Sequence, residues 1–514
     1  MGLTSLEASL ASALPKGSPF ILHHVSTPPT KCPAIYASQL GKEEDETYCE
    51  SHFLSVSIEH DSKHIHVFAI EVLIYTTTRL TTLFVSKADS TGYLHLQRAE
   101  RGARSPLKTI ATTFLQHLID HRARAGRRLV LSLFARAQNQ YLFPGSVENT
   151  EKHVLDDRGL VKWWCRVIDP ILEEHKTSYG SRRNEQGGTD EAQAFIRVPG
   201  YDTYGTRTFF PKDVCKQAAI DKRWKVGDPL TELSEARNVP ERCLIPRFPD
   251  DPKARFVDTL DEELPDDDNA SSQSLSQESL KRVHDGRWRS IRSLEQFWEA
   301  MSFRQECSSG RLVGFIWALF PSVSTPGSEA DGTTVEPAQD ETKNGENFSS
   351  PKKEDAPRTT PKPQDHMQEA QTLKESTELP EATAHYLWPK KSRGEVVLSA
   401  AEYDEVGKFL LSLDYTNTAT ASDSTNKWIK DVGRRGSIEQ WGKTILGEKQ
   451  ADAAPSLVSK EEKGTNMLSA GLVRKKKRQV EEADADPSLN VNHLGAGLMR
   501  KKPKMNGVHL AAES

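Results

Sequence analysis

The uneven spread of large apolar residues is the feature that most limits how this chain of 514 residues can fold. Only 36% of all residues are apolar, and between residues 322 and 385 the large ones are too sparse to offset the entropy lost on ordering. Folded and unfolded parts must therefore coexist. We expect a core at 1–321, a disordered insertion at 322–393, a helical segment at 394–415 that returns to the core, and a disordered basic tail at 416–514.

Periodic patterns predict an α/β fold in which a central mixed sheet is flanked by helices. Two β-branched runs at 53–58 and 65–75 enclose a polar turn and predict a hairpin. Helical spacing of apolar residues predicts amphipathic helices from 106 to 119 and, after a capping box, from 399 to 413. Further expected elements are helices at 1–13, 160–173 and 293–301, strands at 80–86, 129–134, 195–198, 206–210 and 312–319, and a loop at 258–279.

What the sequence lacks excludes several classes of protein. Its six cysteines contain no Cys-x-x-Cys pair, which argues against a zinc site and a disulfide framework and fits a reducing compartment. No run of about 18 apolar residues exists, so we expect no membrane span. The first 13 residues lack the basic start of a signal peptide. Without Gly-x-Gly-x-x-Gly or a Walker loop, chemistry driven by nucleotides has no support.

Residues 248–256 read Phe-Pro-Asp-Asp-Pro-Lys-Ala-Arg-Phe and concentrate both signs of charge. The two prolines fix their own φ and favour extended neighbours, so Asp250 and Asp251 are predicted to sit on a stiff loop rather than in a helix or a central strand. Adjacent carboxylates beside Lys253 form the kind of cluster in which pKa values are pushed apart. A solvated acidic turn is the alternative, because Asp and Pro are common turn residues.

Two other segments have the composition of ligand contacts, and one helix carries a tryptophan pair. Residues 87–92 are small, polar and glycine-bearing at the end of an expected strand; a plain connection is the alternative. Arg98 and Arg101 precede the N-terminus of the next expected helix, where an anion could bind, with a solvated charged turn as the alternative. Trp163 and Trp164 are adjacent on a helix and cannot face the same way, so one is expected toward the core and the other toward a cleft, unless both belong to the core.

The tail contains a repeat that joins apolar anchors to basic clusters. Residues 466–476 (Asn-Met-Leu-Ser-Ala-Gly-Leu-Val-Arg-Lys-Lys) recur with few changes at 492–502. This pattern favours nuclear import or docking on an acidic partner, with a solvated charge run as the alternative. No aromatic residue lies among the basic clusters for base stacking, so direct nucleic-acid binding is only weakly supported.

Taken together, these motifs resemble the fungal histone acetyltransferases known as regulators of Ty transposition, whose fold is shared with the CREB-binding-protein acetyltransferases of animals. The resemblance covers roughly residues 50–320, with a weaker match at 394–415. The stretches that carry it occur in the family's order: 84–89, 140–144, 152–155, 162–164, 198–200 and 248–256.

The resemblance implies a single acetyltransferase domain that transfers acetyl groups from acetyl-CoA to lysines of histone H3, without a metal. It also implies histone chaperones of the anti-silencing and nucleosome-assembly types, which present H3 as the H3–H4 dimer, and roles in chromatin assembly, transcription regulation, DNA replication and DNA repair in the nucleus. No membrane and no sequence-specific nucleic acid are expected as partners. The rival hypothesis is a catalytically silent histone-binding or chaperone-scaffold protein, which the segregated acidic and basic segments would serve equally well.

The acceptor lysine must lose a proton before it attacks a thioester, because free lysine has a pKa of about 10.4. With the resemblance, we expect Asp251 to act as proton acceptor or relay, Asp89 and Asp250 to shape the local field, and Trp164 to wall the lysine channel. Lys253 corresponds to a lysine that the family's enzymes acetylate on themselves.

Acetyl-CoA needs anion contacts for its phosphates and apolar walls for its pantetheine. The segment 94–101 follows the family pattern only loosely, so the phosphate contacts rest on the weakest part of the match. The positions that the resemblance assigns to acetyl-CoA, with Tyr141 added as a second wall of the channel, are Ala88, Asp89, Ser90, Gln97, Arg98, Arg101, Phe134, Gln138, Tyr141, His153, Val154, Leu155 and Trp164.

Overall fold

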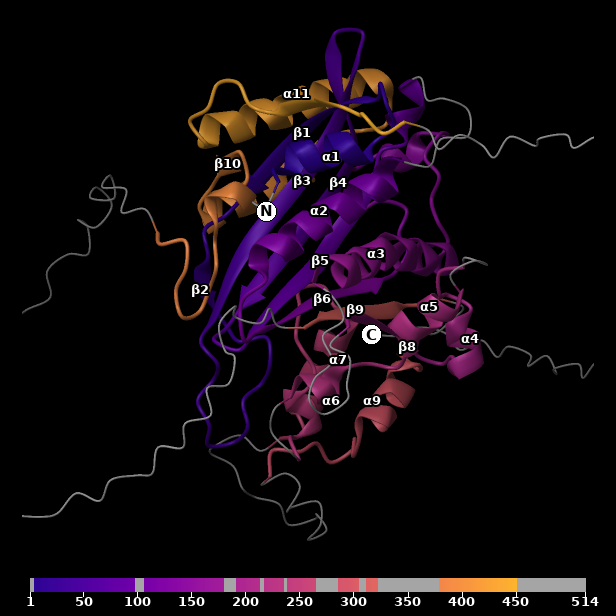
Figure 1. Cartoon of the computed structure of the whole chain (residues 1–514), viewed down its shortest axis with the longest axis vertical. Helices are drawn as coiled ribbons and strands as arrows, with labels where there is room; N and C mark the ends of the chain where they lie inside the picture. The colour runs from indigo at the N-terminus through magenta and orange to yellow at the C-terminus, as the bar shows by residue number, and fades with distance from the viewer. Residues whose placement is uncertain are drawn as a thin grey trace, which may run out of the picture. The chain divides into compact units, whose positions relative to one another are not determined.

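The computed structural model describes residues 4–97, 106–179, 191–212, 217–234, 238–264, 285–304, 311–321 and 379–450. These residues form one large mixed sheet with helices packed against it (Figure 1). The sheet order is β10-β1-β3-β4-β5-β6-β9-β7-β8, with β11 paired to β1 and β2 paired to β3. Most neighbours are antiparallel, but β5 and β6 run parallel, as do β7 and β8 and also β1 and β10. The predicted α/β class with a central mixed sheet is confirmed.

The strands and helices have the following bounds. The strands are β1 Pro19–Ser26, β2 Thr30–Cys32, β3 Thr47–His60, β4 Lys63–Thr76, β5 Leu80–Ser90, β6 Arg128–Ala135, β7 Gln193–Arg197, β8 Trp224–Val226, β9 Gly314–Phe320, β10 Val396–Val397 and β11 Lys443–Leu446. The helices are α1 Leu6–Ala13, α2 Pro106–Arg122, α3 Asp157–Tyr179, α4 Thr203–Arg207, α5 Gln217–Arg223, α6 Leu230–Leu233, α7 Pro252–Asp261, α9 Leu294–Met301, α10 Ala400–Leu410 and α11 Thr418–Arg435. No helix within these described ranges is long and apolar enough to cross a bilayer.

Alternating side chains along the central strands bury apolar groups on both faces of the sheet. On β6, Leu129 and Leu131 belong to the cluster that includes the apolar residues of α2 and α3, whereas Val130 between them belongs to the cluster with α7 and α9. Strand β9 alternates in the same way at Ile316 and Trp317. A strand covered on both faces reads as a continuous apolar run, which is how β6 and β9 appear in the sequence. Figure 1 shows α1, α2 and α3 side by side over the sheet.

Several local predictions are confirmed. Strands β3 and β4 form the predicted hairpin, and its turn places Asp61 and Ser62 at positive φ. Helices α2 and α9 lie where apolar spacing placed them. The capping box of α10 forms as predicted, with the Ser399 hydroxyl accepting from the Glu402 N–H while the Glu402 carboxylate accepts from the Ser399 N–H.

Three other local predictions are wrong. Residues 206–210 are not a strand, because Asp202 caps the short helix α4 by accepting from the Gly205 N–H at 2.7 Å. The expected connection at 87–92 is largely strand, since β5 continues to Ser90 after a bulge in its pairing with β4. The expected loop from residue 258 begins within α7, which runs to Asp261.

The two predicted boundaries of the folded core also need correction. Residues 379–393 were assigned to the insertion, yet Tyr386 and Trp388 are buried against the core. Residues 416–450 were assigned to the tail, yet they contain α11, whose Trp428 is fully buried, and β11, which adds to the sheet beside β1. These segments hold few apolar residues, but their large aromatic side chains are buried against a core that already exists. The rest of the predicted insertion and tail, including both basic repeats, lies outside the described residues.

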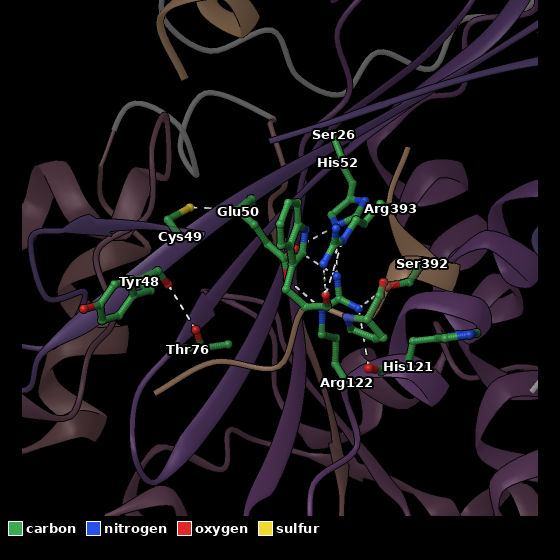
Figure 2. Close-up of polar contacts among 12 residues, drawn as sticks. Ser26, Tyr48, Cys49, Glu50, His52, Thr76, His121, Arg122, Ser392 and Arg393 are labelled. Carbon is green, nitrogen blue, oxygen red and sulfur yellow. Dashed lines mark hydrogen bonds and ion pairs between the residues drawn. The ribbon is translucent and has the colours of Figure 1, made fainter. Parts of the chain in front are cut away.

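A buried ion pair attaches the chain that returns after the insertion (Figure 2). Arg122, at the end of α2, donates from Nε and Nη2 to the two carboxylate oxygens of Glu50 on β3, at 2.6 and 2.9 Å. The same guanidinium donates to the hydroxyl of Ser392, and His52 also contacts both partners. Since Arg122 and Glu50 are both buried, Ser392 closes a charged site that would otherwise be incompletely bonded.

Candidate active site

The candidate site lies at the edge of the sheet where β5 and β6 end. The two strands are parallel, so their carboxyl ends lie side by side. Ala88 and Ser90 occupy the end of β5, and Phe134 occupies the end of β6. The loop that follows β6 carries Gln138 and Tyr141. Predicted acetyl-CoA positions from separate parts of the sequence therefore meet at one edge.

Asp89 fixes this loop rather than facing solvent. Its Oδ2 accepts from the backbone N–H groups of Tyr141, Leu142 and Phe143, at 2.7, 2.9 and 3.3 Å. Its Oδ1 accepts from the Lys152 ammonium at 2.9 Å and from the Ser90 N–H at 2.8 Å. The carboxylate side chain is only 8% exposed. Asp89 thus holds the loop after β6 against the end of β5.

Lys152 and Gly92 complete this junction. The Lys152 ammonium is buried and also donates to the Ser146 hydroxyl at 2.8 Å. Gly92 has φ +89°, and a Cβ at this position would lie 2.7 Å from the Lys152 backbone. Glycine is therefore required twice, by the left-handed backbone and by the close approach of the two chains.

Asp251 and Lys253 form a second buried pair. Asp251 is the N-cap of α7, where its Oδ1 accepts from the Lys253 N–H at 2.9 Å, and Pro252 is the first helical residue. Its Oδ2 accepts from the Lys253 ammonium, which lies 4.4 Å from the centre of the Phe315 ring. Burial lowers the pKa of Lys253, and the Asp251 carboxylate opposes that shift. The predicted role of Asp251 as proton acceptor fits this geometry poorly, because both of its oxygens contact Lys253 and no oxygen reaches solvent.

Asp250 is the carboxylate that faces solvent. Its side chain is 66% exposed, and its backbone has the unusual φ of +58° for a residue with a side chain. The Lys87 ammonium lies 4.0 Å from its Oδ2 and 3.1 Å from the Glu71 Oε2 on the neighbouring strand. Each of the three predicted carboxylates therefore has its own lysine partner, and the pair of Asp250 and Lys87 is the most open of the three.

The two predicted aromatic walls differ in their exposure. Tyr141 is half-buried, and burial raises the pKa of its phenol while Arg136 beside it acts in the opposite direction. The charges of Asp250 and Lys87 also act on the pKa of this phenol, so Tyr141 lies in the same part of the site as the open carboxylate. Trp164 is almost fully buried in the core, with its ring 4.8 Å from that of Trp163. Since Trp163 is the more exposed of the two, the structure places Trp164 toward the core.

The remaining predicted acetyl-CoA positions divide into four groups. Phe134 is half-buried and stacks on Phe84, with ring centres 6.1 Å apart. Gln97 points away, because its amide donates to the Pro19 carbonyl. Arg98 and Arg101 lie outside the described residues. The last group is exposed or half-exposed. Gln138 lies in the loop after β6, and the segment before α3 contains His153, Val154 and Leu155.

Sequence reasoning gave no role to Lys152, Glu71 or Tyr403, which organise the site. Lys152 pairs with a carboxylate 63 residues away, and the Tyr403 hydroxyl donates at 3.0 Å to Glu71, 332 residues away. The signal available for Lys152 was its place in the matched stretch 152–155. A single sequence holds no signal for the contact made by α10.

A cavity of about 320 Å³ lies at the other end of β5 and β6. Arg79, Leu80 and Arg128 line it at the strand starts, and its lining includes none of the positions predicted for acetyl-CoA. Glu43 and Asp45 also line this cavity. We place the candidate site at the carboxyl ends of β5 and β6, because the predicted site residues gather there and not at the cavity.

Comparisons with known proteins agree with the resemblance. The chain matches the histone acetyltransferase KAT11-type domain over residues 6–129 and 125–431. It is 41% identical to the histone acetyltransferase rtt109 of Aspergillus flavus, over 91% of this chain and 88% of that protein. It is 30% identical to the histone acetyltransferase rtt109 of Schizosaccharomyces pombe, over 58% and 67% of the two chains. The crystal structure of Rtt109 from Aspergillus fumigatus superposes with a TM-score of 0.68 at 40% identity, over 87% of this chain and 100% of that one.

Proposed function

Because this chain belongs to the fungal Rtt109 histone acetyltransferases of the KAT11 type, we propose that it acetylates lysines of histone H3. The substrate would be the H3–H4 dimer held by a histone chaperone of the anti-silencing or nucleosome-assembly type. The proposal includes a nuclear role in chromatin assembly, DNA replication and DNA repair. The family assignment favours an enzyme over the catalytically silent scaffold.

The observation that carries the proposed chemistry is the open carboxylate of Asp250 beside Tyr141. An acceptor lysine that reaches this edge meets a proton acceptor on one side and an aromatic wall on the other. In the reaction, the acceptor ammonium gives one proton to Asp250. Its free amine then forms an amide bond with the acetyl carbon as the carbon–sulfur bond of acetyl-CoA breaks, and the CoA thiolate that leaves takes up the second proton that the nitrogen loses.

Acetyl-CoA would bind along the carboxyl ends of β5 and β6. Ala88 and Ser90 offer backbone groups there, and Phe134 with Leu155 offers apolar surface to the pantetheine. Asp89 would act by holding the Tyr141 loop and not by touching the acetyl group, since both of its carboxylate oxygens already accept hydrogen bonds within the protein and its side chain is nearly buried.

The proposal extends to acetylation of Lys253 by the enzyme itself. Burial lowers the pKa of Lys253 and favours its neutral, nucleophilic form. An acetyl group there would remove the positive charge beside Asp251 and leave that carboxylate with two neutral N–H groups of Lys253, the backbone N–H and the side-chain amide N–H. The change would convert a buried ion pair into a single buried charge at the start of α7.

Radiolabelled acetyl-CoA tests this function directly. The purified full chain is incubated with H3–H4 dimers, free or bound to a purified chaperone, and the histones are separated by electrophoresis. We expect label on H3, at a higher rate in the chaperone complex, and intact mass spectrometry should show an added acetyl group on Lys253. Label confined to another histone would refute the H3 assignment, and equal rates with and without the chaperone would refute chaperone dependence.

A further inference from the structure

Lys87 has no part in the proposed chemistry so far, although it lies closer to the open carboxylate than any other charged group described there. It sits on β5 directly opposite Glu71 of β4, at a bulge between the two strands. Bulges redirect side chains at functional sites. Here the bulge places the Lys87 ammonium between two carboxylates, 3.1 Å from Glu71 and 4.0 Å from Asp250.

Glu71 is itself held in place from the opposite side. Its Oε1 accepts from the Tyr403 hydroxyl at 3.0 Å, and Tyr403 is buried on α10. Burial, reinforced by the Glu71 charge, raises the pKa of Tyr403 well above its usual value, so its hydroxyl remains a neutral donor. One oxygen of Glu71 is thus committed to α10 and the other to Lys87. The Lys87 side chain is 28% exposed, so its ammonium is anchored but still borders solvent.

Groups from four elements lie around this ammonium. Glu71 comes from β4 and Tyr403 from α10, Asp250 comes from the turn before α7, and Tyr141 comes from the loop after β6 together with Arg136. Of the two carboxylates, Glu71 is the closer to the Lys87 ammonium and the more buried. A fixed positive charge is therefore present at the place where the acceptor lysine must lose its own.

We propose that the Lys87 ammonium is a further functional group of the acetyl-transfer site, whose fixed positive charge drives the incoming lysine toward its neutral, nucleophilic form. A like charge nearby disfavours the charged state of an amine, and enzymes activate lysine nucleophiles with neighbouring cations in this way. Glu71 keeps Lys87 in place when Asp250 takes the proton from the acceptor. The inference rests on the proposed role of Asp250 as proton acceptor. It adds Lys87 as the group that disfavours the charged form of the substrate lysine.

The pH dependence of acetyl transfer tests this role. The kcat for acetylation of core histones is measured from pH 6 to 10 with the full chain and with Lys87→Met, which keeps most of the length of the side chain and removes its charge, because kcat reports the ionisation of the bound acceptor lysine. We expect the rise of kcat to move to higher pH by about one unit, with a loss of about tenfold at pH 7 that disappears at pH 10. Lys87→Arg should retain the native midpoint, because the charge remains.

Controls separate charge from structure. Lys408→Met removes an exposed lysine of α10 that pairs with Glu405 of the same helix, and its profile should match that of the native chain. If Lys87→Met unfolds, as judged by thermal denaturation, Lys87→Gln provides the same test. A Lys87→Met profile with the native midpoint, or one lowered equally at every pH, would overturn the inference, as would a Lys87→Arg profile shifted like that of the methionine variant. Because the assay scores acetyl transfer to all core histones, a preference for a histone other than H3 would refute the H3 proposal alone.

Discussion

Replacing Asp89 with asparagine should disturb the site through the loop that follows β6. The asparagine keeps one oxygen, which can still accept from the N–H groups of residues 141–143. Its NH2 group then faces the Lys152 ammonium and the Ser90 N–H, both of which are donors. The buried lysine loses its counterion, and breaking a buried pair in this way costs about 3–5 kcal/mol. At about 2 °C per kcal/mol for a domain of this size, the melting temperature should fall by about 6–10 °C.

Activity should fall for the same reason. Displacing a positioning group by about 1 Å can cost roughly a hundredfold in rate, and Tyr141 is held by the Asp89 carboxylate. We therefore expect kcat/KM for acetyl-CoA to drop by about that factor. The measurement is a double-mutant cycle of Asp89→Asn, Lys152→Met and their combination, followed by thermal unfolding and by steady-state kinetics. The double variant should be more stable than the sum of the single effects predicts, by at least about 1 kcal/mol. Losses of stability that add in the double variant, or an unchanged melting temperature in Asp89→Asn, would refute the role of Asp89 as the counterion of Lys152.

Three further predictions address other parts of the chain. Arg122→Met leaves Glu50 buried without its counterion, so we expect a loss of about 3–5 kcal/mol and faster proteolysis within 379–393; a proteolysis pattern like that of the native chain would contradict the attachment. Burial raises the pKa of Asp120 to about 6, above its value of 3.8 when unfolded, so the folded state binds the extra proton and stability falls as pH rises through that window. Melting temperatures between pH 4 and 7 should therefore vary less in Asp120→Asn than in the native chain, and parallel curves would contradict the shift. Deletion of residues 465–514 should slow acetylation of chaperone-bound H3–H4 while sparing Lys253 acetylation, because a tethered basic segment raises the local concentration of its partner; equal rates in a purified reaction would leave nuclear import as its role.

The elements that could be predicted from sequence are those whose signals are local. The hairpin of β3 and β4 follows from two apolar runs and a short polar turn, and the start of α10 follows from the spacing of Ser399 and Glu402. The helix α7 was also readable, since Asp251 followed by Pro252 is a good N-cap and first helical residue. Pro249 and Pro252 also stiffen the chain, which favoured the prediction of a loop. The two interpretations use the same residues, and a helix is favoured because Pro252 directly follows a residue that can cap it.

The candidate carboxylates could be named from the sequence, but their roles could not. Asp250 and Asp251 are adjacent and chemically identical, yet one is mostly exposed and the other is buried on Lys253. That difference arises from the positive φ of Asp250, which turns its side chain outward as the helix begins. Asp89, predicted as a group of the active centre, accepts from a loop and a lysine that lie more than 50 residues later in the chain, which its sequence neighbours do not reveal. Burial and distant partners decide what a carboxylate does, and neither is encoded in its immediate neighbours.

The boundaries of the core were misplaced for a different physical reason: a low density of apolar residues does not prevent a segment from packing on an existing core. A segment that must build its own core needs many apolar residues, since ordering costs roughly 1–2 kcal/mol per residue. A segment that docks on a finished core needs only a few large side chains and a closing polar contact. Burial of Trp388 and of Trp428 each stabilises the folded state by about 1.5–3 kcal/mol or more. The turns between them form local hydrogen bonds. Ser392 accepts a hydrogen bond from the buried Arg122 guanidinium. The same docking supports the active edge, because the segment after α10 places the Tyr415 N–H at 2.8 Å from the Pro144 carbonyl, directly behind the loop that Asp89 holds. Apolar counts in a window therefore measure whether a segment can fold alone, and they underestimate segments whose order is supplied by the rest of the protein.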